Sequence, residues 1–184
     1  MQTADLGALK THQVAALTTD QISQGLTTAQ VAALNTAVVA ALTTSQVAQG
    51  LTTDQIVALT TQQVAALTTA QVAQGLTTSQ VAAMQTQDVA ALKTSQLVVL
   101  TTDQVSQLTT DQVVALTTAQ VASLTTSQVA QGLTTDQVAA LQTADVAALR
   151  TTQLAALTTS QVAQLTTDQI VALTTAQVSG LTTS

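Results

Sequence analysis

The 184-residue chain contains no cysteine, no proline and no aromatic residue. The absence of cysteine excludes disulfides and thiolate metal sites, and the absence of aromatic rings leaves no platform on which nucleic-acid bases could stack. Charged residues are scarce, with three basic residues against nine acidic ones and a net charge of −6. Such a surface is poorly suited to a phosphate backbone, so we predict that the chain does not bind nucleic acid.

Long apolar runs are also missing. The longest, such as residues 37–42, are far shorter than the roughly 20 residues that a helix needs to cross a bilayer, and we predict no membrane insertion. No signal peptide is visible, because the sequence starts directly in repeat sequence. Since the chain also stops in the middle of a repeat, at residues 181–184, we expect it to be an excerpt of a longer array.

The chain consists of one eight-residue repeat, an octad with the consensus Leu-Thr-Thr-x-Gln-Val-Ala-Ala. Nearly pure copies are residues 26–33 and 133–140, and extra glycines follow some octads. A longer period relates Asp54, Asp111 and Asp168, and its seven octads could make two superhelical turns. A short, complete repeat is typical of a solenoid. We therefore predict one uninterrupted octapeptide-repeat solenoid over residues 1–184.

The octad pattern favours a short helix over a strand or a long helix. Leu at the first place and Val at the sixth would lie on opposite faces of a strand, and in a continuous helix the apolar stripe would rotate by about 80° per octad. Thr-x-x-Gln, in contrast, is a capping box that starts a helix. We predict an all-α solenoid of short capped helices, one per octad, with about three to four octads per superhelical turn. A β-solenoid is the alternative.

The capping box assigns structural residues to each octad. In residues 51–56, Thr52 would be the cap and Gln55 the third helical residue. The second place also holds Lys and Arg, which are poor caps, so which Thr of each pair caps the helix is left open. Each inserted glycine stands where a left-handed C-terminal cap is expected. The predicted capping residues are Thr18, Thr27, Thr43, Thr52, Gln21, Gln30, Gln46, Gln55, Gly25, Gly50, Gly75 and Gly132.

No residue pattern indicates catalysis or metal binding. His12 is the only histidine, and nothing marks the orienting partner and nucleophile that a catalytic histidine needs. The Asp residues occur at most once per octad, whereas a calcium site needs several oxygens in one loop, so we interpret them as helix N-terminal residues. Lys10, Lys93 and Arg150 share the second place and are interpreted as solubilising residues. We predict a non-enzymatic protein without catalytic residues, metal or cofactor.

The fragment Leu-Thr-x-x-Gln-Val resembles helix starts in TAL effector repeats and in EF-hand proteins. The base-reading loop of the former and the calcium loop of the latter are absent here, so neither function is expected. Over its full length the chain resembles the LTTxQ octad tracts of large predicted bacterial secreted or surface proteins. That resemblance implies an extracellular or cell-surface location.

The leading functional hypothesis is a structural repeat module, a rigid spacer or adhesive stalk of a secreted or surface protein. An ice-binding solenoid is an alternative, because regular Thr faces on solenoids resemble those of antifreeze proteins. A self-assembling filament module is another, since uncapped ends would expose the core to the next copy. The expected partners are accordingly another copy end to end, ice or a surface. The Thr residues assigned to the surface array are Thr52, Thr77, Thr101, Thr109, Thr134 and Thr166.

Overall fold

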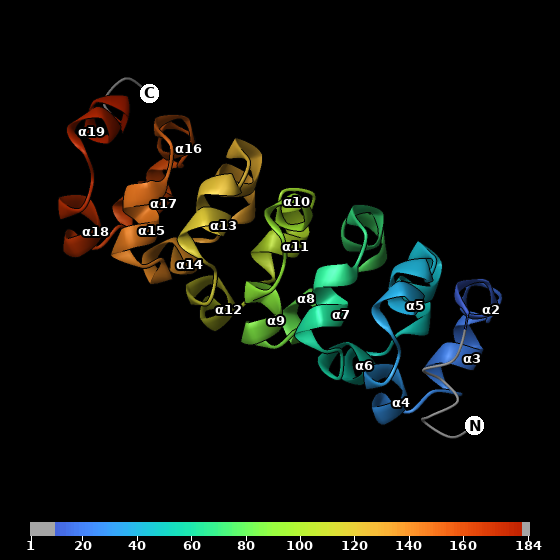
Figure 1. The fold of residues 1–184 in the computed structure, drawn as a ribbon. Helices are drawn as coiled ribbons and strands as arrows, with labels where there is room; N and C mark the ends of the chain where they lie inside the picture. The colour runs from blue at the N-terminus through green and yellow to red at the C-terminus, as the bar shows by residue number, and fades with distance from the viewer. Residues whose placement is uncertain (1–9, 182–184) are drawn as a thin grey trace. The chain divides into compact units, whose positions relative to one another are not determined.

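The computed structural model describes residues 10–181, and in this range every octad forms one short helix of four to seven residues (Figure 1). No strand occurs among the described residues. The prediction of an all-α repeat solenoid is confirmed, and the alternative β-solenoid is wrong. No helix in this range is long and apolar enough to cross a membrane.

The chain forms two compact units, residues 1–99 and residues 100–184. The helices of the first unit are α2 (Thr11–Ala15), α3 (Thr19–Ser23), α4 (Thr28–Ala32), α5 (Thr36–Ala41), the π-helix η1 (Gln46–Gly50), α6 (Thr53–Val57), α7 (Thr61–Ala66), the π-helix η2 (Gln71–Gly75), α8 (Thr78–Ala83), α9 (Thr86–Ala90) and α10 (Thr94–Leu97). Those of the second unit are α11 (Thr102–Ser106), α12 (Thr110–Val114), α13 (Thr118–Ser123), the π-helix η3 (Gln128–Gly132), α14 (Thr135–Ala140), α15 (Thr143–Ala148), α16 (Thr151–Ala155), α17 (Thr159–Ala163), α18 (Thr167–Val171) and α19 (Thr175–Leu181).

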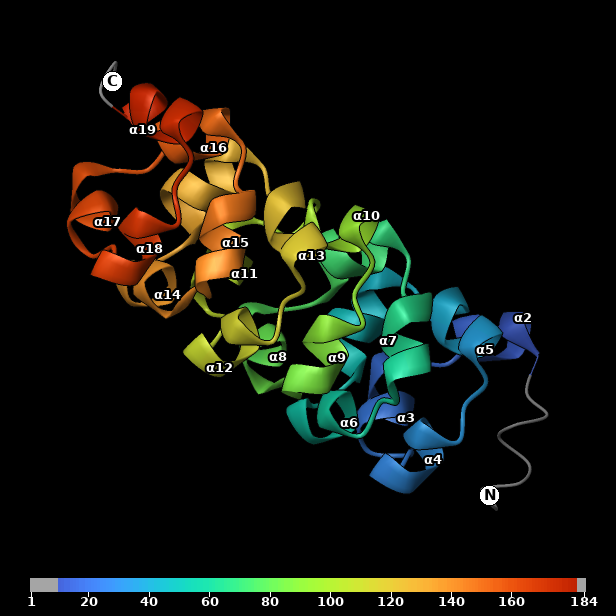
Figure 2. The same ribbon diagram turned by 60° about the vertical axis from the view of Figure 1, so that its left-hand side comes forward.

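In both units helices pack on the helix three octads away, and side chains also reach the helix four octads away, so one superhelical turn contains between three and four octads. In the first unit α2 packs on α5 and α5 on α7, so that these helices lie one after another along the stack (Figure 2). The starts of α6 and α8, which also pack together, are 25 residues apart, and those of α15 and α18 in the second unit are 24 apart. The expectation of about three and a half octads per turn agrees with this packing. A Cβ at Gly75 would meet Val47, 28 residues earlier, and one at Gly132 would meet Val105, 27 residues earlier. Both separations are about half of the 57-residue period between Asp54 and Asp111.

The core of each unit is built from two places of the octad. The first-place Leu and the sixth-place Val are buried throughout the interior, as Leu67 and Val72 illustrate. Leu precedes the N-terminal cap and Val follows it by four residues, which is the spacing of a hydrophobic staple. The Ala residues at the last two places are half-buried, as at Ala65 and Ala66. Their small side chains allow successive turns to approach closely.

The inserted glycines are not left-handed caps. No glycine among the described residues has a positive φ, so this prediction is wrong for Gly25, Gly50, Gly75 and Gly132. The last three end η1, η2 and η3, in which the extra residue is absorbed as a widened π-turn. At Gly25, an added Cβ would overlap the Gln21 carbonyl oxygen.

The reason for glycine in the π-turns is close approach to the preceding turn. A Cβ built at Gly75 would lie 3.1 Å from the Cβ of Val47, and one at Gly132 would lie 3.0 Å from the Cβ of Val105. Both distances are shorter than ordinary carbon contacts. A larger residue would therefore require the facing Val to move by a few tenths of an ångström, so packing between turns, and not backbone conformation, explains these glycines.

Candidate functional site: a ladder of buried glutamines

Most of the helices begin with a reciprocal pair of hydrogen bonds. In the octad that starts at Leu76, the Gln80 N–H donates to Thr77 Oγ1 (3.2 Å), and the Thr77 N–H donates to Gln80 Oε1 (2.8 Å). Thr77 has extended backbone angles and the following Thr is the first helical residue, so the second-place Thr is the cap. The same pair of bonds joins Thr18 to Gln21, Thr27 to Gln30, Thr43 to Gln46 and Thr52 to Gln55.

The fifth-place Gln also binds the preceding turn. The Nε2 atom of Gln80 donates to the carbonyl oxygens of Val47 (2.9 Å) and Leu51 (2.6 Å). These carbonyls lie near the C-terminal end of an earlier helix, where the main chain lacks helical partners. One amide therefore starts its own helix and completes the end of another, 29 to 33 residues earlier in the sequence.

This arrangement recurs within both units. We call the buried fifth-place residues that donate to a preceding turn the glutamine ladder; its members are Gln46, Gln55, Gln63, Gln71, Gln80 and Gln96 in the first unit, and Gln128, Gln137, Gln153, Gln161, Gln169 and Gln177 in the second.

Glutamine suits this place because its amide both accepts and donates hydrogen bonds. Oε1 serves the cap of its own helix, and Nε2 serves the carbonyls of the preceding turn. Glutamate could accept but not donate, and would place a charge against carbonyl oxygens; leucine could do neither. Because an unsatisfied buried polar group costs about 1–3 kcal/mol, the ladder favours one register between successive turns.

In two octads the amide that bonds to the preceding turn comes from the second place instead of the fifth. In the octads that start at Met84 and Leu141, Asp replaces the fifth-place Gln and Gln replaces the second-place Thr. Gln85 Nε2 donates to the Val57 carbonyl (2.9 Å), and Gln142 Nε2 donates to the Val114 carbonyl (3.0 Å). The bond between turns is thus retained from the second place, while the Asp residue fills the buried place.

The two buried carboxyl groups have raised pKa values. Asp88 is 0% exposed, and burial raises its pKa from 3.8 to about 6. Burial also raises the pKa of Asp145, although hydrogen bonds from the Thr118 side chain and the Gln142 backbone oppose the rise. Neither carboxyl oxygen of Asp88 has a hydrogen-bond partner. A raised folded-state pKa means that folding is favoured by protonation: the contribution is fully present below about pH 3.8 and is lost as the pH rises through about 6.

The other ionisable residues form no cluster. His12, Lys10 and Lys93 are exposed, and the Arg150 guanidinium donates to the Leu124 carbonyl of the preceding turn (3.2 Å). Within residues 10–181 no group of three side chains could hold a metal ion. Asp5 lies outside the described residues. The remaining Asp residues are exposed in the first turns of their helices, at Asp20, Asp54, Asp103, Asp111, Asp136 and Asp168.

The Thr residues assigned to a surface array are all exposed N-terminal caps. The structure brings some of them together: Thr52 and Thr77 cap the stacked helices α6 and α8, and Thr109 and Thr134 cap α12 and α14. Thr101 caps the helix before that of Thr109, and Thr166 caps α18, which packs on α15 with its Gln142 cap. Four of the six therefore form two stacks of two, Thr101 and Thr166 lie outside them, and the set does not form one continuous row.

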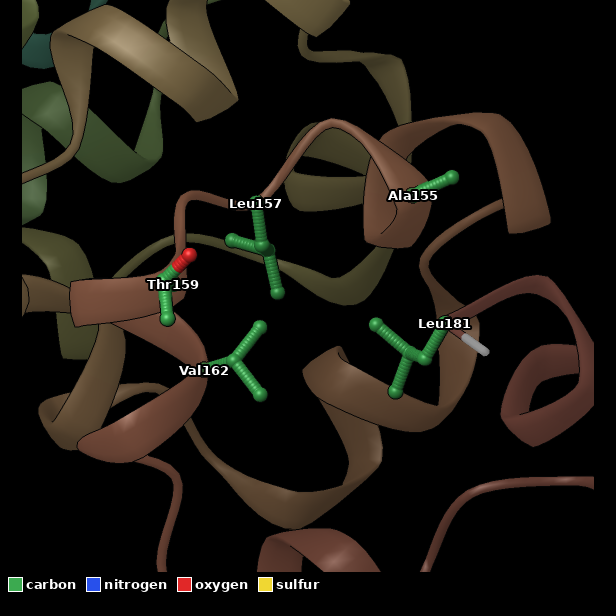
Figure 3. Close-up of a pocket in the computed structure, with 5 residues that line it drawn as sticks. All are labelled: Ala155, Leu157, Thr159, Val162 and Leu181. Carbon is green, nitrogen blue, oxygen red and sulfur yellow. The ribbon is translucent and has the colours of Figure 1, made fainter. Parts of the chain in front are cut away.

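A small apolar hollow lies in the second unit between α16, α17 and α19 (Figure 3). Its volume is about 190 Å³, and its lining includes the side chains of Leu157, Val162 and Leu181, which point toward one another. Ligand pockets usually enclose roughly 300–1,000 Å³ and hold a few convergent polar groups. Thr159 is the one polar residue among the described residues that line it.

Sequence reasoning finds the cap but not the ladder. In the octads with Lys10, Lys93 and Arg150 the capping Thr is lost and the Gln is kept. The Gln Oε1 there still accepts from the main-chain N–H of the second-place residue, so its persistence is explained by the cap. The sequence therefore carries no separate signal for the bonds that Nε2 donates to the preceding turn.

Comparison with known proteins identifies a repeat family. The family model described as the ALTTAQ repeat matches residues 1–36, 24–61, 81–118, 114–143, 138–175 and 146–183. The last two matches are displaced by eight residues, which is one octad, as expected for interchangeable units. No curated protein and no solved structure matches the chain.

Proposed function

The chain belongs to the ALTTAQ repeat family, and we propose that it serves as a rigid spacer or stalk segment of a secreted or cell-surface protein. The observation that carries this proposal is the glutamine ladder. Its buried amide groups form hydrogen bonds that hold one turn to the next. A repeat-only architecture of short helices is consistent with a non-enzymatic role.

The ladder provides resistance to extension within each unit. Pulling neighbouring turns apart would break the two bonds of an amide such as Gln80 and would expose a layer of Leu and Val side chains to water. The outer surface has few charges and many Thr, Gln and Ser side chains, which suits a segment that separates other parts of a protein without binding them.

Stretching single molecules of the full chain tests this function. A spacer held by the ladder resists extension up to a defined force and then lengthens in steps, because a turn is released only when its buried bonds break. A chain that extends smoothly at low force, like the same molecule in denaturant, would contradict the proposal. The proposed location is tested separately, by antibody labelling of intact cells that produce the protein: labelling is expected, and staining only after permeabilisation would refute a surface location.

Ice binding is a second candidate, favoured by the exposed Thr caps that stack in successive turns, such as Thr109 on α12 and Thr134 on α14. Thermal hysteresis of the purified protein would support it. The variant Thr109→Tyr should then lose the effect, whereas Thr101→Tyr, outside this stack, should retain it. A solution that freezes without hysteresis at all protein concentrations would remove this candidate and leave the spacer in place.

A further inference from the structure

Asp88 occupies a place at which the other octads around it have an amide donor. In the next octad along the chain, the Gln96 Nε2 atom donates to the Val64 carbonyl (3.0 Å) and to the Leu67 carbonyl (2.7 Å), 32 and 29 residues earlier. An ionised carboxyl group accepts hydrogen bonds but has no hydrogen to donate. In the octad of Asp88, an acceptor therefore takes the place of a donor inside the first unit.

The main-chain carbonyls at the same separations from Asp88 are those of Ile56 and Leu59. The Leu59 carbonyl accepts no hydrogen bond from any residue that the structure describes, and the Ile56 carbonyl accepts only from main-chain N–H groups of its own turn. Gln85 does not replace the missing donor at these two carbonyls, because its amide donates to the Val57 carbonyl. The end of α6 therefore keeps main-chain oxygens without the side-chain donor that other turns provide.

The Asp88 carboxyl group is buried without any compensation. The residue is 0% exposed, and neither carboxyl oxygen has a hydrogen-bond partner. No basic side chain within residues 10–181 forms an ion pair with it. Because a buried charge is costly unless it is paired or coordinates a metal ion, the ionised carboxyl group needs a cation. Aspartate is also one methylene shorter than glutamine, so its carboxyl group ends before the position that Nε2 reaches in the ladder.

We propose that the Asp88 carboxylate and the main-chain carbonyls of Ile56 and Leu59 bind one alkali cation, Na⁺ or K⁺, which takes the place of the missing amide donor. The ligands are all oxygen atoms, which suit hard cations. Main-chain carbonyls at the C-terminal ends of helices coordinate Na⁺ in other proteins, and these two lie at the end of α6.

The charge of the site favours a monovalent cation. One carboxylate balances one monovalent charge, whereas a divalent cation would leave a buried positive charge. Calcium takes six to eight oxygen ligands, including several carboxylates, and no group of three acidic side chains occurs among the described residues. One carboxyl group with main-chain oxygens is also a combination that the repeat pattern does not reveal.

Asp145 in the second unit provides an internal comparison. It holds the same place in its octad and is also buried. The Thr118 side chain and the Gln142 backbone donate hydrogen bonds to its carboxyl group, and one of its two oxygens lacks a partner. Because the chain itself satisfies part of this carboxyl group, we assign the cation to Asp88. The inference goes beyond the spacer function and does not depend on it.

Thermal denaturation of the full chain tests the site, at about pH 8, above the Asp88 pKa of about 6. Solutions of choline chloride, NaCl and KCl are compared at equal ionic strength. Above the dissociation constant, each tenfold rise in alkali cation should raise the thermal midpoint by about 3–5 °C. Asp88→Gln supplies the ladder amide, so it should fold and lose the difference between alkali and choline salts. Asp145→Gln makes the same change of charge and should keep it.

The line width of the sodium-23 nuclear magnetic resonance signal tests binding without relying on stability. The unchanged chain and Asp145→Gln should broaden the signal, added KCl should reverse the broadening, and Asp88→Gln should leave the signal narrow. Equal thermal midpoints in choline and alkali salts, a response that persists in Asp88→Gln, or a response to CaCl₂ alone would overturn the inference. A chain that shows no cation response but still resists extension would leave the spacer function intact.

Discussion

Replacing Gln80 with Met should lower the free energy of unfolding far more than removing the Thr77 cap of the same helix. Gln80 lies in the interior of the first unit and makes three side-chain bonds: it accepts from the Thr77 N–H and donates to the Val47 and Leu51 carbonyls. Met has a similar volume, so it creates little cavity, but it makes none of these bonds. The change therefore isolates the polar role of the residue from its packing.

The magnitude follows from the two carbonyls that would lose their partner. An unsatisfied buried acceptor costs about 1–3 kcal/mol, and a lost cap bond a further 0.5–1.5 kcal/mol or so. Gln80→Met, which leaves two such acceptors unpaired, should therefore lower the free energy of unfolding by about 3–7 kcal/mol. Thr77→Ala removes only the Oγ1 acceptor of the cap, which costs about 1 kcal/mol.

Urea denaturation followed by far-ultraviolet circular dichroism measures both changes. Gln80→Met is expected to shift the urea midpoint by a large amount and Thr77→Ala by a small amount. If the Gln80→Met chain does not fold while the Thr77→Ala chain does, the conclusion is the same. Gln21→Met provides a second control, because Gln21 makes the same cap but is exposed in the first turn. Equal effects of Gln80→Met and Thr77→Ala would refute the role of the ladder between turns.

Two further predictions concern the buried acids and the inserted glycines. The raised pKa of Asp88, about 6 against 3.8, implies that the unchanged chain loses on the order of 3 kcal/mol of stability between about pH 4 and pH 7; Asp88→Asn should flatten this part of a pH series of urea midpoints, and an unchanged slope would contradict the assignment. Gly132→Ala should destabilise by about 1–3 kcal/mol because its Cβ would lie 3.0 Å from Val105. Gly180→Ala, whose Cβ would have no neighbour closer than 3.8 Å, should leave the thermal midpoint unchanged or raised, and equal losses in both variants would refute the packing argument.

The sequence predicts the local structure of each octad well because the interactions concerned are local. The bonds between Thr52 and Gln55 join residues three apart, and the staple of Leu51 and Ile56 joins residues five apart. Such contacts can be read from one octad without knowledge of its neighbours. They determine where each helix begins, which residues face the core and which face water.

The contacts between turns could not be predicted in the same way. Gln55 donates to the carbonyls of Ile22 and Leu26, 33 and 29 residues earlier, and every turn offers equivalent carbonyls. The repeated pattern therefore permits several numbers of octads per turn, and packing decides among them. The same limitation explains the error at the glycines: a left-handed cap is a local explanation, whereas the constraint at Gly75 comes from Val47 in the preceding turn.

The most direct test of the ladder is a nuclear magnetic resonance measurement of couplings across its hydrogen bonds. In a chain labelled segmentally with nitrogen-15 and carbon-13, the Gln80 side-chain nitrogen should couple to the carbonyl carbons of Val47 and Leu51, and its amide protons should exchange with water far more slowly than those of Gln21. Coupling to carbonyls of a different turn, or amide exchange as fast as that of Gln21, would contradict a solenoid whose successive turns are held together by buried glutamines.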